Sequence, residues 1–117
     1  MSEACYIEVK NQIELIHCWP KAPVEVGYLR HLHRHVFTVY STIEVFHDDR
    51  ELEFIQVQHH LKWFLGRYNF QPSVSCEQIA RIVAQHILDE YGERNVRVSV
   101  FEDNENGATV KIKKESV

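Results

Sequence analysis

Cysteine is scarce in this 117-residue chain, and its scarcity excludes two kinds of small protein. The three cysteines, Cys5, Cys18 and Cys76, are an odd number, are scattered along the chain and include no Cys-x-x-Cys pair. Neither a disulfide framework nor a cysteine zinc knuckle is therefore expected. So few thiols fit a reducing compartment, and we predict a cytoplasmic protein.

Long apolar runs and an excess of positive charge are also missing. No apolar stretch reaches the length of a membrane span, and the first residues lack the basic and apolar regions of an export signal. The formal net charge of -4 gives no broad attraction to nucleic acid or anionic lipid, which leaves only a local basic patch such as Lys111, Lys113 and Lys114. We expect neither nucleic acid nor a membrane as a partner.

Histidine, by contrast, is abundant. The chain has eight histidines, five of them between His17 and His47, and histidine concentrated in this way often serves metal binding or proton transfer. With 44% hydrophobic and 26% charged residues the composition is that of a folded protein. The length predicts a single domain that spans residues 1–117.

Alternation of apolar and polar residues predicts two long strands in the first half of the chain. Over residues 6–17 the odd positions are mostly apolar, and His17 lies in phase with them. Over residues 33–46 the odd positions again share one face, and His33 and His35 lie on it. The segment between these strands contains two prolines, which predict a connecting loop.

Two amphipathic helices are predicted next. Apolar residues from Phe54 to Leu65 recur at steps of three and four, which indicates a helix that stops near Gly66. Ser75 and Gln78 have the spacing of a capping box for a second helix, and Gly92 suits an αL stop.

Alternation over residues 96–100 and 108–112, with a turn between them, predicts a closing hairpin. The predicted order is therefore ββααββ, a layered α+β fold.

Three histidines have the spacing of a metal site. Catalytic zinc typically takes three protein ligands, and neutral imidazole is a favoured one. His33 and His35 are two residues apart on a strand, so both project from the same face, and His17 can supply a third ligand from a neighbouring strand. His31 shares their phase and could replace either of the pair, and all of them could instead be histidines satisfied by hydrogen bonds. Four histidines have no distinguishing spacing and are expected to be surface or structural residues: His47, His59, His60 and His86.

Glu102 interrupts the apolar pattern of the last hairpin. It continues the inward face of Val96, Val98 and Val100, where an unpaired carboxylate would be costly to bury. A carboxylate there can accept hydrogen bonds from the N–H and NH₂ edge of a pterin or guanine-like ring. The alternative is a strand-end glutamate that reaches water.

These positions together resemble the 6-pyruvoyl-tetrahydropterin synthase and 6-carboxy-tetrahydropterin synthase family, whose members have the tunnelling fold, or T-fold. The resemblance spans nearly the whole chain. Ile16-His17 is similar to the end of the family's Ala-Ala-His motif, and Leu32-His33-Arg34-His35-Val36-Phe37 to its Leu-His-Gly-His motif. The family's Asp-Phe and Leu-Lys segment is similar to Leu52-Glu53-Phe54 with the helix through Lys62. Its Pro-Thr-x-Glu-Asn-x-Ala helix start is similar to Ser75-Cys76-Glu77-Gln78-Ile79-Ala80. Its ring-anchoring glutamate is similar to Glu102 in Phe101-Glu102.

The resemblance implies a fold, a metal and a ligand. The fold is an α+β T-fold, an antiparallel four-stranded sheet with two helices on one face. The metal is Zn2+, with His31 outside the site and three ligands: His17, His33 and His35. The ligand is a pterin or purine-like ring anchored by Glu102, in a pocket lined by Ser75, Cys76 and Glu77. A ring-like homo-oligomer, a hexamer or a tetramer, is implied as well, and exposed strand edges give a physical reason for it.

Four departures from the family pattern affect the chemistry. Leu29 stands where the family has its catalytic cysteine, and residues 65–70 contain no counterpart of the family's Asp-His pair. Arg34 replaces the glycine of His-Gly-His, and Val74 replaces the proline before the second helix. We therefore predict a zinc-binding protein of this kind, either a lyase that acts on dihydroneopterin triphosphate through another base or a noncatalytic binding or structural oligomer.

Overall fold

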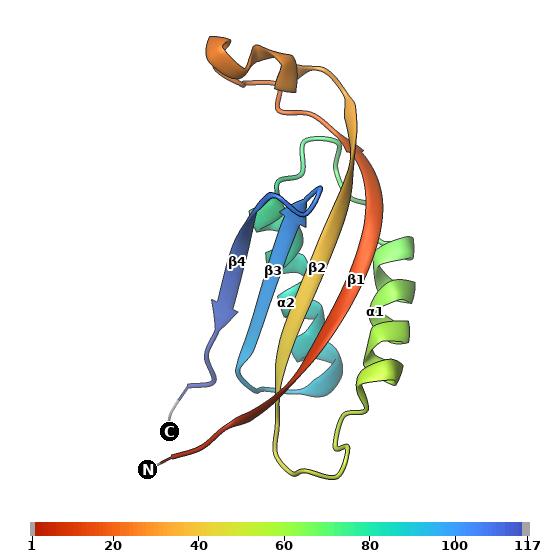
Figure 1. Cartoon of the computed structure of the whole chain (residues 1–117), viewed down its shortest axis with the longest axis vertical. Coiled ribbons are helices and arrows are strands. Elements are labelled where there is room, and N and C mark those ends of the chain that lie inside the picture. Colours follow the sequence, from red (N-terminus) through yellow and green to blue (C-terminus); the bar gives the residue numbers. More distant parts are fainter. Residues whose placement is uncertain (1, 116–117) are drawn as a thin grey trace.

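Two layers make up residues 2–115, the part of the chain that this computed structural model describes (Figure 1). An antiparallel four-stranded sheet forms one layer, and two α-helices on one of its faces form the other. The elements in chain order are β1 (Cys5–His17), η1 (Val24–Arg30), β2 (His33–Val45), α1 (Phe54–Arg67), α2 (Cys76–Tyr91), β3 (Val96–Glu102) and β4 (Asn106–Ile112). The predicted α+β class and the order ββααββ of the longer elements are confirmed. Within residues 2–115, each helix falls short of what a membrane crossing requires in length and apolar character.

The register of the sheet brings the chemically interesting residues to one end of it. The strand order is β1-β2-β3-β4, and every neighbouring pair is antiparallel. His17 at the end of β1 lies opposite His33 at the start of β2, and Phe37 lies opposite Glu102 at the end of β3. Because directly opposed side chains point to the same face, these residues project together from the helix-covered side of the sheet.

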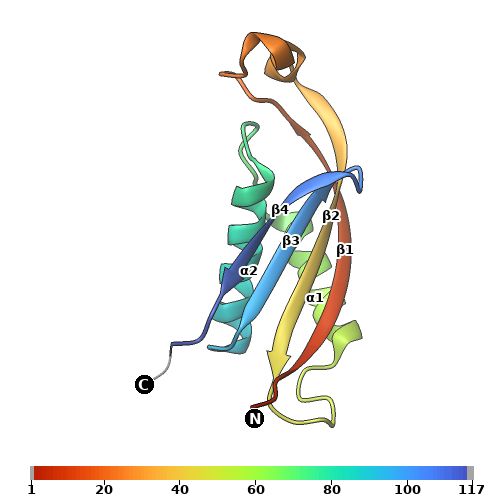
Figure 2. The ribbon, with the colours of Figure 1, turned by 60° about the vertical axis from the view of Figure 1, so that its left-hand side comes forward.

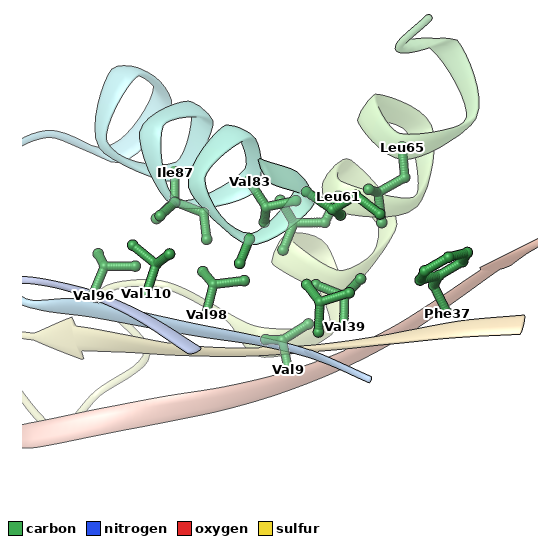
Figure 3. Packing of buried hydrophobic residues seen from close by; sticks show 14 of the residues in the cluster. Val9, Phe37, Val39, Leu61, Leu65, Val83, Ile87, Val96, Val98 and Val110 are labelled. Carbon is green, nitrogen blue, oxygen red and sulfur yellow. The ribbon is translucent and has the colours of Figure 1, made fainter. Parts of the chain in front are cut away.

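The core fills the space between this face and the two helices (Figure 3). The odd positions of β2 and the apolar stripes of both helices interlock there, as the alternation and the helical spacing predict. Side chains with no exposed surface come from every layer: Phe37, Val39, Ile43, Leu61, Ile79, Val83, Ile87, Val98 and Val100. Phe54, which the sequence pattern includes in the inner stripe of α1, is instead 56% exposed because the first turn of α1 lies at the margin of the sheet beside Cys5 and Val45.

Both helices begin at side-chain caps. The carboxylate of Glu53 accepts hydrogen bonds from the backbone N–H groups of Ile55 and Gln56, and so caps α1. The predicted capping box of α2 is present: the Ser75 hydroxyl accepts from the Gln78 N–H, and the Gln78 side chain accepts from the Ser75 N–H. Gly92 ends α2 with a φ of 88°, but its ψ of 172° is extended, so the predicted αL conformation is wrong.

A projecting arm, residues 18–32, joins β1 to β2 (Figures 1 and 2). The sequence predicts a connecting loop here, and within it residues Val24–Arg30 form η1, two short 3-10 turns joined at a kink at Val26. No residue of η1 is buried, and the side chains of Val24, Tyr28 and Leu32 are 84%, 71% and 65% exposed. The arm therefore presents apolar surface to its surroundings, directly beyond the end of the sheet where the histidines gather.

Candidate metal centre

Three imidazoles converge where β1 ends and β2 begins. The ring centroids lie 4.5 Å apart for His17 and His33, 4.8 Å for His33 and His35, and 5.5 Å for His17 and His35. One ring nitrogen from each residue lies within 4.8 Å of the other two, which is a spacing that can hold a metal ion. We call this group the sheet-end cluster. It follows from the antiparallel register, which sets His17 opposite His33, and from the two-residue repeat of β2.

Backbone carbonyl groups fix the orientation of two of the three rings. The Nδ1 of His17 lies 2.9 Å from the carbonyl oxygen of Val74, and the Nδ1 of His33 lies 2.8 Å from that of His31. A carbonyl oxygen can only accept, so each Nδ1 carries the proton and donates it. In a neutral imidazole the Nε2 lone pair is then free, which is the form that binds a metal. His31 therefore contributes its carbonyl group, while its exposed side chain lies outside the cluster.

A carboxylate orients the third ring. The Nδ1 of His35 donates to the carboxylate of Asp103, which also accepts from the backbone N–H of Val36 at 3.1 Å. The hydrogen bond from His35, followed by that from Val36, lowers the pKa of Asp103. Metal-binding histidines commonly donate their second ring nitrogen to a carboxylate in this way, and the contact raises the basicity of the ligand.

Asp103 was not identified from the sequence, where it belonged only to the predicted turn. It has a φ of 49°, and the next residue, Asn104, has a φ of 59°. This left-handed backbone, which aspartate and asparagine tolerate better than most residues, turns the Asp103 side chain back toward β2. An aspartate directly after the inward-facing Glu102 was the one signal available, and it gave no indication of which residue the carboxylate would meet.

The buried Nε2 atom of His17 shows that the cluster suits a cation. His17 is 7% exposed, and among residues 2–115 its Nε2 has no hydrogen-bond partner. Glu102 Oε1 lies 3.3 Å from it, but two lone pairs face each other there when the proton is on Nδ1. A buried polar atom without a partner is destabilising by about 1–3 kcal/mol. A metal ion, or a second proton on the ring, would remove that penalty.

Glu102 lies at the edge of the sheet-end cluster. Its two carboxylate oxygens lie 3.3 Å from the Nε2 of His17 and 3.8 Å from the Nε2 of His35, and its side chain is 34% exposed. It is thus neither a fully buried charge nor a residue pointing away into water. Each of its two oxygens faces the Nε2 of a different histidine, and part of the side chain remains exposed to solvent.

The segment just before α2 contacts the cluster through the carbonyl of Val74. The Ser75 hydroxyl is occupied as the helix cap, and the Glu77 side chain is exposed. Cys76 is buried, and desolvation, with smaller effects of the negative charges of Glu102 and Glu77, raises its pKa to about 12. The thiol is therefore protonated near neutral pH and is not a thiolate nucleophile.

Comparison with known proteins assigns no family. No family model matches the chain, and no curated protein matches it either. The geometry of the sheet-end cluster and the short motifs that contain its residues are therefore the basis on which a function can be inferred.

Proposed function

We propose that this protein is a zinc-binding T-fold protein, similar to the 6-pyruvoyl-tetrahydropterin and 6-carboxy-tetrahydropterin synthases, that recognises a pterin or purine-like ring. The observation that carries this proposal is the orientation of three imidazoles. In each of His17, His33 and His35 the Nδ1 atom donates to an oxygen, so the Nε2 atoms of all three are left for one ion.

Zinc is one of the transition metals that this donor set favours. Three neutral imidazoles are the protein ligands of many catalytic zinc sites, in which the fourth position stays open for water or substrate. Imidazole donors select transition metals over Mg²⁺ and Ca²⁺, which prefer oxygen ligands. When bound, zinc would act as a Lewis acid that polarises oxygen atoms of the ligand.

Ring recognition is assigned to Glu102. An ionised carboxylate can accept two parallel hydrogen bonds from the N–H and NH₂ edge of a pterin or guanine-like ring, and apolar neighbours cannot. The partial exposure of Glu102 leaves room for a ligand to approach, and its position beside the Nε2 atoms of His17 and His35 would bring that ligand to the metal. Ser75, Cys76 and Glu77, at the start of α2, would line the same pocket.

Whether the pocket supports turnover depends on a base that replaces the thiolate. Leu29 stands at the position of the family's cysteine, and the thiol of Cys76 has a pKa of about 12. These two observations favour a second candidate function, a noncatalytic binding or structural protein that keeps the metal and the ring pocket. The first candidate, a lyase acting on dihydroneopterin triphosphate, requires a carboxylate or imidazole as the base.

A ring-like homo-oligomer, a hexamer or a tetramer, is part of the proposal. In the described chain β1 and β4 are the outer strands of the sheet, and each has one edge that no other strand covers. Exposed edges of this kind favour pairing with another copy. The apolar side chains on and beside the arm, such as Trp19, Tyr28 and Leu32, add surface that a neighbouring subunit would bury. The described cysteines are all free, which suits the cytoplasm.

Incubation of the zinc-loaded protein with dihydroneopterin triphosphate, followed by mass spectrometry, tests the proposal. Zinc-dependent loss of the triphosphate, absent in His35→Ala, would establish the lyase. Unchanged substrate that binds to the parent and not to Glu102→Gln would establish the noncatalytic alternative. If the protein neither converts nor binds the substrate, ring recognition is contradicted.

A further inference from the structure

A second group of metal-binding side chains lies between the two helices, on residues separate from the sheet-end cluster. His60 comes from α1, and His86 and Glu90 come from α2. The Nε2 atoms of the two histidines lie 2.8 Å apart, and Glu90 Oε2 lies 3.9 Å from the Nε2 of His60. One ligand atom from each residue lies within 4.8 Å of the other two. We call this group the helix-seam cluster.

The geometry of the helix-seam cluster is set by the helices themselves. His86 and Glu90 are four residues apart on α2, so they lie on the same face one turn apart. His60 faces them from α1. The sequence could not indicate this group, because the two histidines are 26 residues apart and meet only when the helices pack side by side on the sheet. Of the four histidines expected to be surface or structural residues, His47 and His59 are exposed, whereas His60 and His86 are half-buried and contact each other.

Aromatic neighbours hold both rings in place. The ring of His86 stacks on that of Phe64, with centroids 3.7 Å apart and planes 10° apart. The ring of His60 lies 5.6 Å from that of Trp63 and 6.0 Å from that of Tyr91. Both histidines are half-buried, whereas Glu90 is exposed. Rings restricted in this way lose little rotational freedom when they bind an ion, and the exposed side gives the ion access.

We infer that His60, His86 and Glu90 form a second metal site, which binds a divalent transition ion such as Zn²⁺ and clips α1 to α2. Two imidazoles and one carboxylate match that class of ion and not Mg²⁺ or Ca²⁺. The distance between the two Nε2 atoms would increase from 2.8 Å when the ion binds. A tetrahedral ion with 2.0–2.1 Å bonds separates its ligand nitrogens by about 3.3 Å. The rest of the coordination shell would be water on the exposed side.

Metal binding at the helix-seam cluster should raise the melting temperature of the protein. A ligand that binds the folded chain and not the unfolded chain raises the free energy of unfolding. At concentrations well above Kd, the increase is proportional to the logarithm of the ratio of ligand concentration to Kd. At a metal concentration about 100 times Kd, the melting temperature of a chain of this size should rise by on the order of 10 °C. The sheet-end cluster would give a rise of its own, so the two sites must be separated by mutation.

The test uses the full chain with His35→Ala as background, which removes one ligand from the sheet-end cluster. Zn²⁺ alone is titrated, and the melting temperature and bound zinc per chain are measured. In this background we expect one equivalent of zinc with a rise in melting temperature. Adding His86→Ala, or Glu90→Gln for a gentler change at an exposed position, should abolish the rise and the bound equivalent. The matched controls, His59→Ala and Asp89→Asn, alter neighbouring residues outside the cluster and should retain both.

Two results would overturn the inference. The first is a His35→Ala protein that binds no zinc and does not change its melting temperature, which would leave only a hydrogen bond between two imidazoles. The second is an equal rise with and without the Glu90→Gln change. Failure of the sheet-end site would be recognised separately, because the parent protein would then bind no more zinc than the His35→Ala background.

Discussion

The sheet-end and helix-seam clusters differ in how their imidazole rings are held. In the sheet-end cluster the Nδ1 of every ring has an oxygen partner: a backbone carbonyl for His17 and for His33, and the Asp103 carboxylate for His35. The Nε2 atoms are thereby left without another role. In the helix-seam cluster the Nε2 atoms of His60 and His86 lie 2.8 Å apart, where they can share one proton.

This difference indicates which of the two clusters would be stabilised more by a bound cation. The sheet-end cluster contains a buried Nε2 atom with no hydrogen-bond partner among residues 2–115, so an ion would satisfy a group that is otherwise unsatisfied. In the helix-seam cluster an ion has to displace an existing hydrogen bond. We therefore expect tight binding at the first and weaker binding at the second, although both offer three ligands.

The largest expected effect comes from removing a ligand of the sheet-end cluster. His33→Ala should weaken zinc binding by more than about 100-fold, because the loss of a direct ligand exceeds the 10- to 100-fold effect of an outer contact. Competition with a chelator measures the change. His31→Ala is the matched control, since only the carbonyl of His31 contacts the cluster, and its affinity should be unchanged. Equal weakening by both substitutions would show that the ligand assignment is wrong.

Glu102→Gln separates ring anchoring from metal binding. Loss of a charge-assisted hydrogen bond weakens binding by about 1.5–3 kcal/mol, so affinity for a pterin such as neopterin should fall by about 10- to 100-fold. Fluorescence titration with neopterin measures this. Zinc affinity should change far less. A larger loss of zinc than of neopterin affinity would make Glu102 a metal ligand instead of the ring anchor.

Asp103→Asn tests the carboxylate that orients His35. Asparagine tolerates the left-handed backbone at this position, so the turn should be preserved. Zinc affinity should fall by about 10-fold, as expected for an outer-shell partner. Glu105→Gln, an exposed change in the same turn, serves as the control in the same chelator competition. If both variants bind zinc as the parent does, the orientation of His35 does not depend on Asp103.

The smallest expected effect is that of Ser75→Ala at the start of α2. Loss of the capping hydroxyl should lower the free energy of unfolding by about 1 kcal/mol, measured by urea denaturation. Because Val74, the neighbouring residue, holds the ring of His17, zinc binding at the sheet-end cluster should weaken slightly while the helix-seam cluster is unaffected. Ser73→Ala provides the control. Identical free energies of unfolding for both variants would show that the Ser75 cap does not stabilise α2.

Much of the fold could be predicted from the sequence because its patterns are regular. The two-residue alternation of β1 and β2 predicts each strand and the face that it buries. The capping box predicts where α2 begins. The helix η1 could not be predicted, because it buries no residue and no apolar pattern marks it. The φ of Gly92 could be anticipated from its place after α2, but its extended ψ could not.

The candidate site was predictable only in part. Alternation places His17, His33 and His35 on the inner face of their strands, yet it does not fix the register that sets His17 opposite His33. The contact of Asp103 with His35 depends on two residues with positive φ, and the helix-seam cluster depends on the packing of α1 beside α2. Such contacts between distant parts of the chain leave no periodic trace in the sequence.

The ligands of the proposed zinc site can be identified directly by zinc X-ray absorption spectroscopy on the protein loaded with one equivalent of Zn²⁺. We expect three imidazole nitrogens in the first shell at about 2.0–2.1 Å, with the imidazole signal reduced in His35→Ala. A shell that contains sulfur at about 2.3 Å, or one made of oxygen alone, would contradict the assignment of His17, His33 and His35 as the ligands.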